Sequence, residues 1–115
     1  AVLKRGDVLQ VFFSRGEDCP ERILVSGMSL AGDWKEWQPS EPVELLRPET
    51  EEEGGNLPVS PSRFGSVHEP VHQLRDPAIF QEDDRLYLLY SGAGETNICC
   101  AELTMQETSQ HQPAR

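Results

Sequence analysis

Basic residues and cysteines are scarce in this sequence. The 115 residues include ten Lys and Arg against 20 Asp and Glu, which gives a formal net charge of −10. Because binding to phosphate groups depends on neutralisation by Lys and Arg, this balance argues against nucleic acid and anionic membranes as partners. The three cysteines, Cys19, Cys99 and Cys100, form no C-x-x-C pair, and a strand would point the two adjacent ones to opposite faces. We therefore expect free, buried thiols in a reducing compartment.

Several other signals are absent. No apolar run approaches the roughly 20 residues that cross a bilayer, and the first residues lack the series typical of a secretory leader. His68, His72 and His111 share no ligand spacing with Cys, so we predict neither a metal nor a cofactor. We expect a soluble chain without a targeting segment of its own, a pattern that favours the cytoplasm over secretion.

Short apolar runs separated by turn residues predict an all-β protein built from antiparallel meander sheets. Glu, Gly, Pro and Ser dominate residues 49–72, which show no periodicity and predict a long irregular loop. The chain thus divides into a first β-unit at 1–48, the loop at 49–72, a second β-unit at 73–104 and a disordered tail at 105–115. The predicted strands are one before residue 5 and six more at 8–14, 22–30, 43–46, 78–81, 86–91 and 98–104.

The two β-units repeat one another. DVLQVFFS, at residues 7–14, is followed by Gly16-Glu17, and DRLYLLYS, at residues 84–91, is followed by Gly94-Glu95. Units of about 40 to 50 residues are typical of four-stranded propeller blades. Apolar residues occupy both faces of residues 86–90, so both faces of that strand are expected to be covered by neighbouring sheets.

The stretch LRDPAIFQEDDRLYLLYSGAGETNICCAEL, residues 74–103, follows a Trp-x-x-Trp loop and the segment ELLRPE. Together these segments resemble the C-terminal blades of the five-bladed β-propeller glycoside hydrolases, the superfamily of arabinanases, xylosidases, invertases and levansucrases. The resemblance implies about two blades of a five-bladed β-propeller. Two blades cannot close that ring, so it further implies a fragment of a longer sugar-active protein, with the missing blades as its partner. The parent is expected to be a glycoside hydrolase, and this chain alone to be inactive.

The resemblance places Asp76 of the Arg-Asp-Pro motif in a sugar site, where it would bind substrate hydroxyls or tune the pKa of the catalytic acid. Arg75 would be its neighbour in substrate binding. Independently of the family, Pro77 is expected to hold Asp76 in the β or polyproline region and so to aim its carboxylate. The alternative is a structural Asp that accepts backbone N–H groups at the strand entrance. Glycoside hydrolysis needs two carboxyl groups, so Asp76 alone is not a mechanism.

Four further residues are weaker candidates for the site. Glu53 stands in a Glu-Gly step, where some relatives carry the general acid, but a solvated acidic run is the simpler interpretation. Glu95 could bind substrate, or the repeat could require its turn. Trp34 and Trp37 could stack on sugar rings, or cover the end of a sheet. The alternatives to a hydrolase are a non-catalytic carbohydrate-binding segment and a propeller used for protein interaction.

Overall fold

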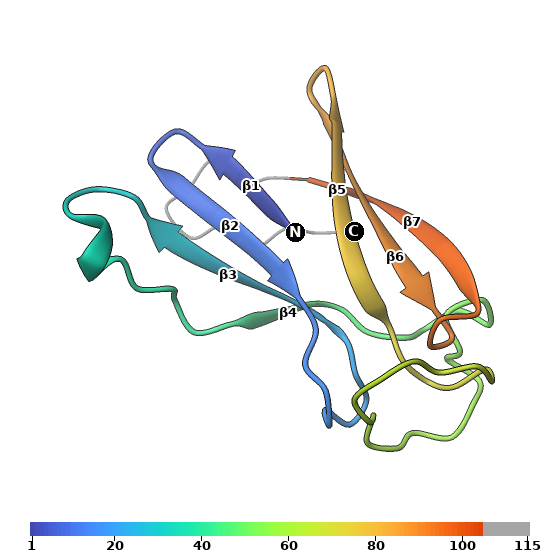
Figure 1. Cartoon of the computed structure of the whole chain (residues 1–115). Helices are drawn as coiled ribbons and strands as arrows, with labels where there is room; N and C mark the ends of the chain where they lie inside the picture. The colour runs from blue at the N-terminus through green and yellow to red at the C-terminus, as the bar shows by residue number, and fades with distance from the viewer. Residues whose placement is uncertain (105–115) are drawn as a thin grey trace.

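The computed structural model describes residues 1–104 and consists of two antiparallel β-sheets (Figure 1). The first sheet has the order β1-β2-β3-β4 and the second has the order β5-β6-β7, so each is a simple meander. The fold class predicted from the sequence, all-β with antiparallel meanders, is confirmed. The strands are β1 (Val2–Arg5), β2 (Val8–Phe13), β3 (Ile23–Ser29), β4 (Val43–Leu46), β5 (Arg75–Glu82), β6 (Arg85–Gly92) and β7 (Asn97–Leu103).

The seven predicted strands are all present, with ends displaced by a residue or two except in β5. This strand begins at Arg75 rather than at residue 78, so the Arg-Asp-Pro motif lies inside the strand. One short 3-10 turn, η1 (Trp34–Glu36), interrupts the connection between β3 and β4. Within residues 1–104, no helix has the length and hydropathy that a membrane span requires. The predicted disordered tail, 105–115, lies outside the described residues.

One hydrophobic core lies between the two sheets. Alternation along β6 turns Leu86, Leu88 and Tyr90 to the same face, and each is at most 5% exposed. The first sheet faces them with Phe12, Ile23 and Val25, while further apolar residues complete the cluster. Because the core draws on both sheets, neither of the two sequence units buries its apolar side chains alone.

The second sheet has another apolar face that residues 1–104 leave open. Phe80 pairs with Tyr87 across β5 and β6, and their rings lie 6.2 Å apart. Phe80 is 50% exposed and Ile98 is 80% exposed, whereas Leu89 is half-buried. The expectation that both faces of β6 are covered is therefore wrong within the described residues, because only the first sheet packs against this strand.

The internal repeat corresponds to equivalent strands. DVLQVFFS forms β2 and DRLYLLYS forms β6, so each repeat supplies the middle strand of a three-stranded meander. The first sheet adds β4 to this pattern. In the turn between β5 and β6, the residue with positive φ is Asp83, at 56°. Asp tolerates this left-handed conformation better than most residues with a Cβ, so the hairpin turn needs no glycine.

Two adjacent leucines on β6 test the shared core. We expect Leu88→Ala, which truncates a side chain with no exposed surface, to lower the free energy of unfolding by about 2 to 5 kcal/mol. Leu89→Ala removes the same atoms from the open face, where about 1 kcal/mol is expected. Chemical denaturation followed by circular dichroism measures both values. Equal losses, or separate transitions for the two sheets, would contradict a single shared core.

Candidate functional site

The long connection between β4 and β5, residues 47–74, lies across one end of both sheets (Figure 1). This is the end at which β5 begins and at which the β2–β3 and β6–β7 connections turn. The Ser62 N–H donates to the Asp18 carbonyl at 2.9 Å, which ties the connection to the first sheet. The Val71 N–H donates to the Ala93 carbonyl at 3.3 Å, which ties it to the second. The predicted loop thus spans the two sheets.

The side chain of Arg75 holds this connection in place through hydrogen bonds to its backbone. This side chain is buried and donates to the Gly65 carbonyl at 2.7 Å and the Arg63 carbonyl at 3.0 Å. It also donates twice to Gln73 Oε1, at 3.1 and 2.9 Å. Glu21 Oε1 lies 3.4 Å from its Nε and supplies the opposite charge. The guanidinium is committed to these protein groups, so Arg75 positions the connection and does not have the exposed surface expected of a substrate-binding residue.

The two Gly-Glu turns of the repeat hold the same connection. Glu95, at the β6–β7 turn, accepts the Val67 N–H on Oε2 at 2.7 Å. Glu17, at the β2–β3 turn, donates its backbone N–H to Ser62 Oγ at 2.9 Å. Gly94 has a φ of 78°, and a Cβ at this position would lie 2.7 Å from Val71 Cγ2. The Gly94-Glu95 step therefore combines a left-handed turn, close packing against Val71 and a hydrogen bond to the long connection.

Asp76 stands next to Arg75 but faces outward. Arg75 pairs with Ser91 and Ala78 with Leu89, so β5 takes three steps where β6 takes two, and the extra residue forms a bulge. Asp76 is exposed, and its φ of 54° is left-handed. The expectation that Pro77 holds Asp76 in the β or polyproline region is wrong, because the bulge imposes the reversed φ. The Ser91 hydroxyl donates to Asp76 Oδ2 at 3.4 Å.

Glu53 is the buried member of the acidic run. Its side chain accepts the N–H groups of Glu49 and Thr50 at 3.0 and 3.1 Å, and the Tyr90 hydroxyl also donates to it. The Glu53 N–H donates in return to Thr50 Oγ1 at 3.2 Å, which completes a reciprocal capping arrangement. Glu53 is only 3% exposed, so the expectation of a solvated run is wrong for this residue. Glu51 and Glu52 are exposed, as that interpretation requires.

The two tryptophans lie apart from these residues. η1 follows β3, at the opposite end of the first sheet from the long connection (Figure 1). Trp34 is 67% exposed, with Lys35 Nζ 6.0 Å from its ring centre. It does not cover the end of the sheet, which corrects one of the two expectations for this residue. Trp37 is half-buried. The structure thus gathers Arg75, Asp76 and Glu95 at one end and leaves both tryptophans at the other.

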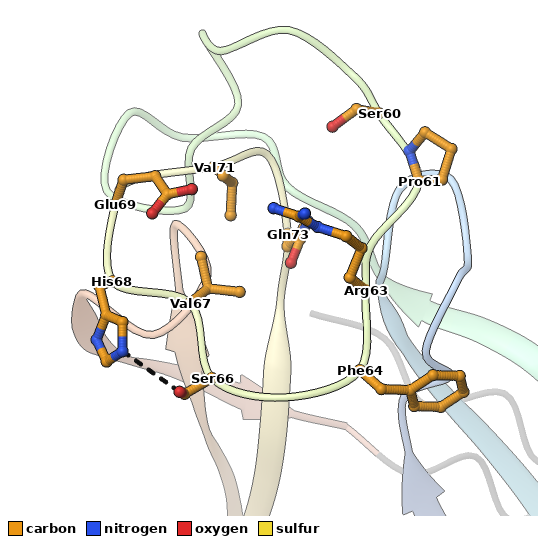
Figure 2. A pocket seen from close by; sticks show the side chains of 10 residues that line it. All are labelled: Ser60, Pro61, Arg63, Phe64, Ser66, Val67, His68, Glu69, Val71 and Gln73. Atoms are coloured by element: carbon orange, nitrogen blue, oxygen red, sulfur yellow. Dashed lines mark hydrogen bonds between the residues drawn. The ribbon is translucent and has the colours of Figure 1, made fainter.

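A pocket of about 390 Å³ opens within the long connection (Figure 2). The side chains of Arg63 and Glu69 point into it from opposite sides of the ring of backbone. Gln73, which also accepts from Arg75, lies behind the Arg63 guanidinium. Asp76 follows Gln73 by three positions, so the pocket lies close along the chain to the exposed carboxylate. The remaining lining residues are Ser60, Pro61, Phe64, Ser66, Val67, His68 and Val71.

Sequence reasoning missed several residues of this end. Glu21, Ser62 and Gln73 are polar and buried, yet nothing in their local sequence distinguishes them from surface residues. Nothing in the local sequence indicates that Arg63 lines a pocket either. The available signal was the length of the connection itself, because long loops in compact domains are often functional. Among residues 1–104, no group of three or more His, Cys, Asp or Glu side chains could hold a metal ion.

The cysteines differ in their surroundings. Cys19 and Cys100 are exposed and Cys99 is half-buried, so the expectation of three buried thiols is wrong. Burial raises the pKa of the Cys99 thiol, and the nearby carboxylates of Glu53 and Glu52 raise it further. A thiol with a raised pKa forms less of the reactive thiolate at a given pH.

The chain resembles one uncharacterized viral protein. It is 47% identical over 103 residues to the uncharacterized protein R118 of Acanthamoeba polyphaga mimivirus. The aligned region covers 89% of this chain but only 29% of R118, so the chain spans less than a third of the relative's length. No family model matches the sequence, and no solved structure matches it.

The buried carboxylate of Glu53 provides a test of how the long connection is held. We expect Glu53→Gln to lower the free energy of unfolding by about 1.5 to 3 kcal/mol, because a charged acceptor of several hydrogen bonds is replaced by an amide. Its exposed neighbour, changed as Glu52→Gln, is the matched control and should have little effect. Urea denaturation measures both variants. A cost for Glu53→Gln no larger than that for Glu52→Gln would contradict the buried anchor.

Thiol reactivity tests the environment of Cys99. At pH 8, we expect iodoacetamide to modify Cys19 and Cys100 before Cys99, because Cys99 combines partial burial with a raised pKa. Quantitative mass spectrometry with fragmentation separates the adjacent Cys99 and Cys100. Raising the pH further should increase the rate at Cys99. Faster modification of Cys99 than of both other cysteines at pH 8 would show that its surroundings differ from those described.

Proposed function

We propose that this chain is part of a five-bladed β-propeller that acts on or binds carbohydrate, with Asp76 in its sugar site. The parent protein is proposed to be a glycoside hydrolase, and this segment by itself to be inactive. The observation that carries the proposal is the conformation of Asp76. Asp76 has a positive φ at a bulge inside a paired strand, not at a hairpin turn as Asp83 does, and its carboxylate is exposed.

The surroundings of Asp76 support a functional role for this conformation. The β5 bulge turns Asp76 outward while its neighbour Arg75 remains buried, and bulges often re-aim a side chain beside an active site. Its one hydrogen bond within residues 1–104 is the long contact from Ser91, at 3.4 Å. The carboxylate therefore lies on a paired strand and is largely open to solvent. Carboxylates placed in this way are suited to accept hydrogen bonds from sugar hydroxyls.

The arrangement of the sheets supports the propeller. Two repeated meanders pack face to face, as successive blades of a propeller do. The second sheet also has the open apolar face formed by Phe80, Tyr87, Leu89 and Ile98. A further blade of a longer protein would cover such a face. The much greater length of the R118 relative is consistent with further structure of this kind.

Catalysis would require residues beyond this segment. Hydrolysis of a glycosidic bond uses two carboxyl groups about 5 to 9.5 Å apart, according to the stereochemical outcome. Glu53, the other candidate, is engaged with Tyr90 and the backbone of its own loop. We therefore assign Asp76 a supporting role, either in substrate binding or in tuning the acid of the parent enzyme.

The test uses two aspartates with nearly the same positive φ. Asp76→Asn and Asp83→Asn each remove one carboxylate at a φ near 55°, namely 54° and 56°. Because Asn also tolerates this region, neither change should disturb folding. In the longer protein, we expect Asp76→Asn to lower kcat/KM on aryl glycosides by about 10² to 10³ and Asp83→Asn to leave it unchanged.

The outcome separates the alternative functions. A loss of affinity with unchanged kcat would favour a carbohydrate-binding role over a catalytic one. Equal activity of Asp76→Asn and the unmodified protein, together with no stabilisation of either by saccharides in thermal melts, would refute the carbohydrate proposal. That second result would leave the protein-interaction propeller as the better interpretation.

A further inference from the structure

The pocket within the long connection is pre-organised. Three neighbouring backbone positions of its wall are fixed by side chains from elsewhere in the fold: Arg63 and Gly65 by Arg75, and Val67 by Glu95. Ser62, beside the wall, is bonded to the β2–β3 turn through both its backbone and its hydroxyl. A site held by so many long-range bonds loses little conformational entropy when a ligand enters.

Arg63 is the distinctive charge of this pocket. Its guanidinium forms no ion pair or hydrogen bond with any residue of 1–104, although the chain has twice as many acidic as basic residues. Figure 2 shows it directed into the ring, facing Glu69 across the pocket. By contrast, the four basic residues that form salt bridges within residues 1–104 do not line this pocket; they are Arg22, Arg47, Arg75 and Arg85. An unpaired guanidinium aimed into a pre-formed pocket favours an anionic group, above all a carboxylate, which it can bind through two parallel hydrogen bonds.

We propose that this pocket binds a saccharide that carries a carboxylate, a uronic acid unit, with Arg63 as the residue that recognises the charge. The inference rests on the proposed carbohydrate function and specifies the class of sugar. The hydroxyl groups of Ser60 and Ser66 offer both donors and acceptors, which matches a ring of sugar hydroxyl groups. Glu69, on the opposite side, accepts hydroxyl donors. The volume of about 390 Å³ is that of a small-ligand pocket.

The pocket and Asp76 are close to one another along the chain. Gln73 lines the pocket, Arg75 holds its wall, and Asp76 follows on the same strand. A sugar chain that contacts Asp76 could therefore place a neighbouring unit in the pocket. Arg63 would then select among sugar chains while Asp76 contributes to binding or chemistry at the adjacent unit.

The experiment compares D-glucuronate with D-glucuronamide, which has the same hydroxyl groups but no charge. Titration of the complete 115-residue chain, followed by heteronuclear NMR, gives both dissociation constants. We expect glucuronate to bind at least about tenfold more tightly, because a charge-assisted bidentate contact is lost with the amide. Arg63→Gln should abolish this preference, and Arg63→Lys should retain part of it. Lys4→Gln, which removes an exposed positive charge on β1, is the matched control and should bind as the unmodified chain does.

The possible results separate this inference from the proposed function. Equal affinity for the two ligands, or unchanged preference in Arg63→Gln, overturns the uronate site, while an effect of Asp76→Asn on the longer protein would still uphold the carbohydrate function. Acetate is a further test ligand. If acetate binds as tightly as glucuronate, the pocket binds simple anions, and the proposal that its ligand is a saccharide is wrong. A circular dichroism spectrum of each variant verifies that the fold is intact.

Discussion

The hydrogen bonds and ion pair of the buried Arg75 guanidinium are the interactions on which the end of the molecule that carries the long connection depends. A charge removed from water must be paired and hydrogen-bonded, because its desolvation is otherwise unfavourable by several kcal/mol. Here the partners come from three places: Glu21 on the β2–β3 connection, Gln73 just before β5, and the backbone of the long connection. Satisfying a single side chain thus fixes the first sheet, the second sheet and the pocket wall relative to one another.

The same requirement accounts for the conformation of Asp76. Arg75 must point inward and β5 must continue its pairing with β6, so an extra residue is accommodated between them as a bulge. Asp76 takes up this irregularity in a left-handed conformation and projects outward. The exposed carboxylate and the buried guanidinium are therefore two consequences of one backbone distortion. Arg75 and Asp76 are both charged and adjacent in the sequence, yet for this reason the first is buried and the second is exposed.

Packing between the sheets follows a simpler rule. Leu86, Leu88 and Tyr90 are buried because the pleat turns every second residue to the first sheet. Tyr87 and Leu89 are equally apolar but face away, and residues 1–104 do not cover them. In a propeller such a face would meet the next blade, so the apolar pattern on both faces of β6 and the open face of the second sheet have a common explanation under the proposed function.

Local pattern alone was sufficient to predict the class of structure and the existence of every strand, because alternation of apolar residues and turn chemistry act over a few neighbouring positions. The exception in position is β5, which begins at Arg75 and not at residue 78. β4 was predicted to the residue, and the repeat correctly related β2 to β6. The same reasoning could not foresee that Glu53 is buried, that Asp76 has a positive φ, or that Arg63 faces a pocket. Each of these depends on partners far away in the chain, such as Tyr90 for Glu53 and Ser91 for Asp76. Tertiary structure decided them because burial and hydrogen bonding are set by the whole fold.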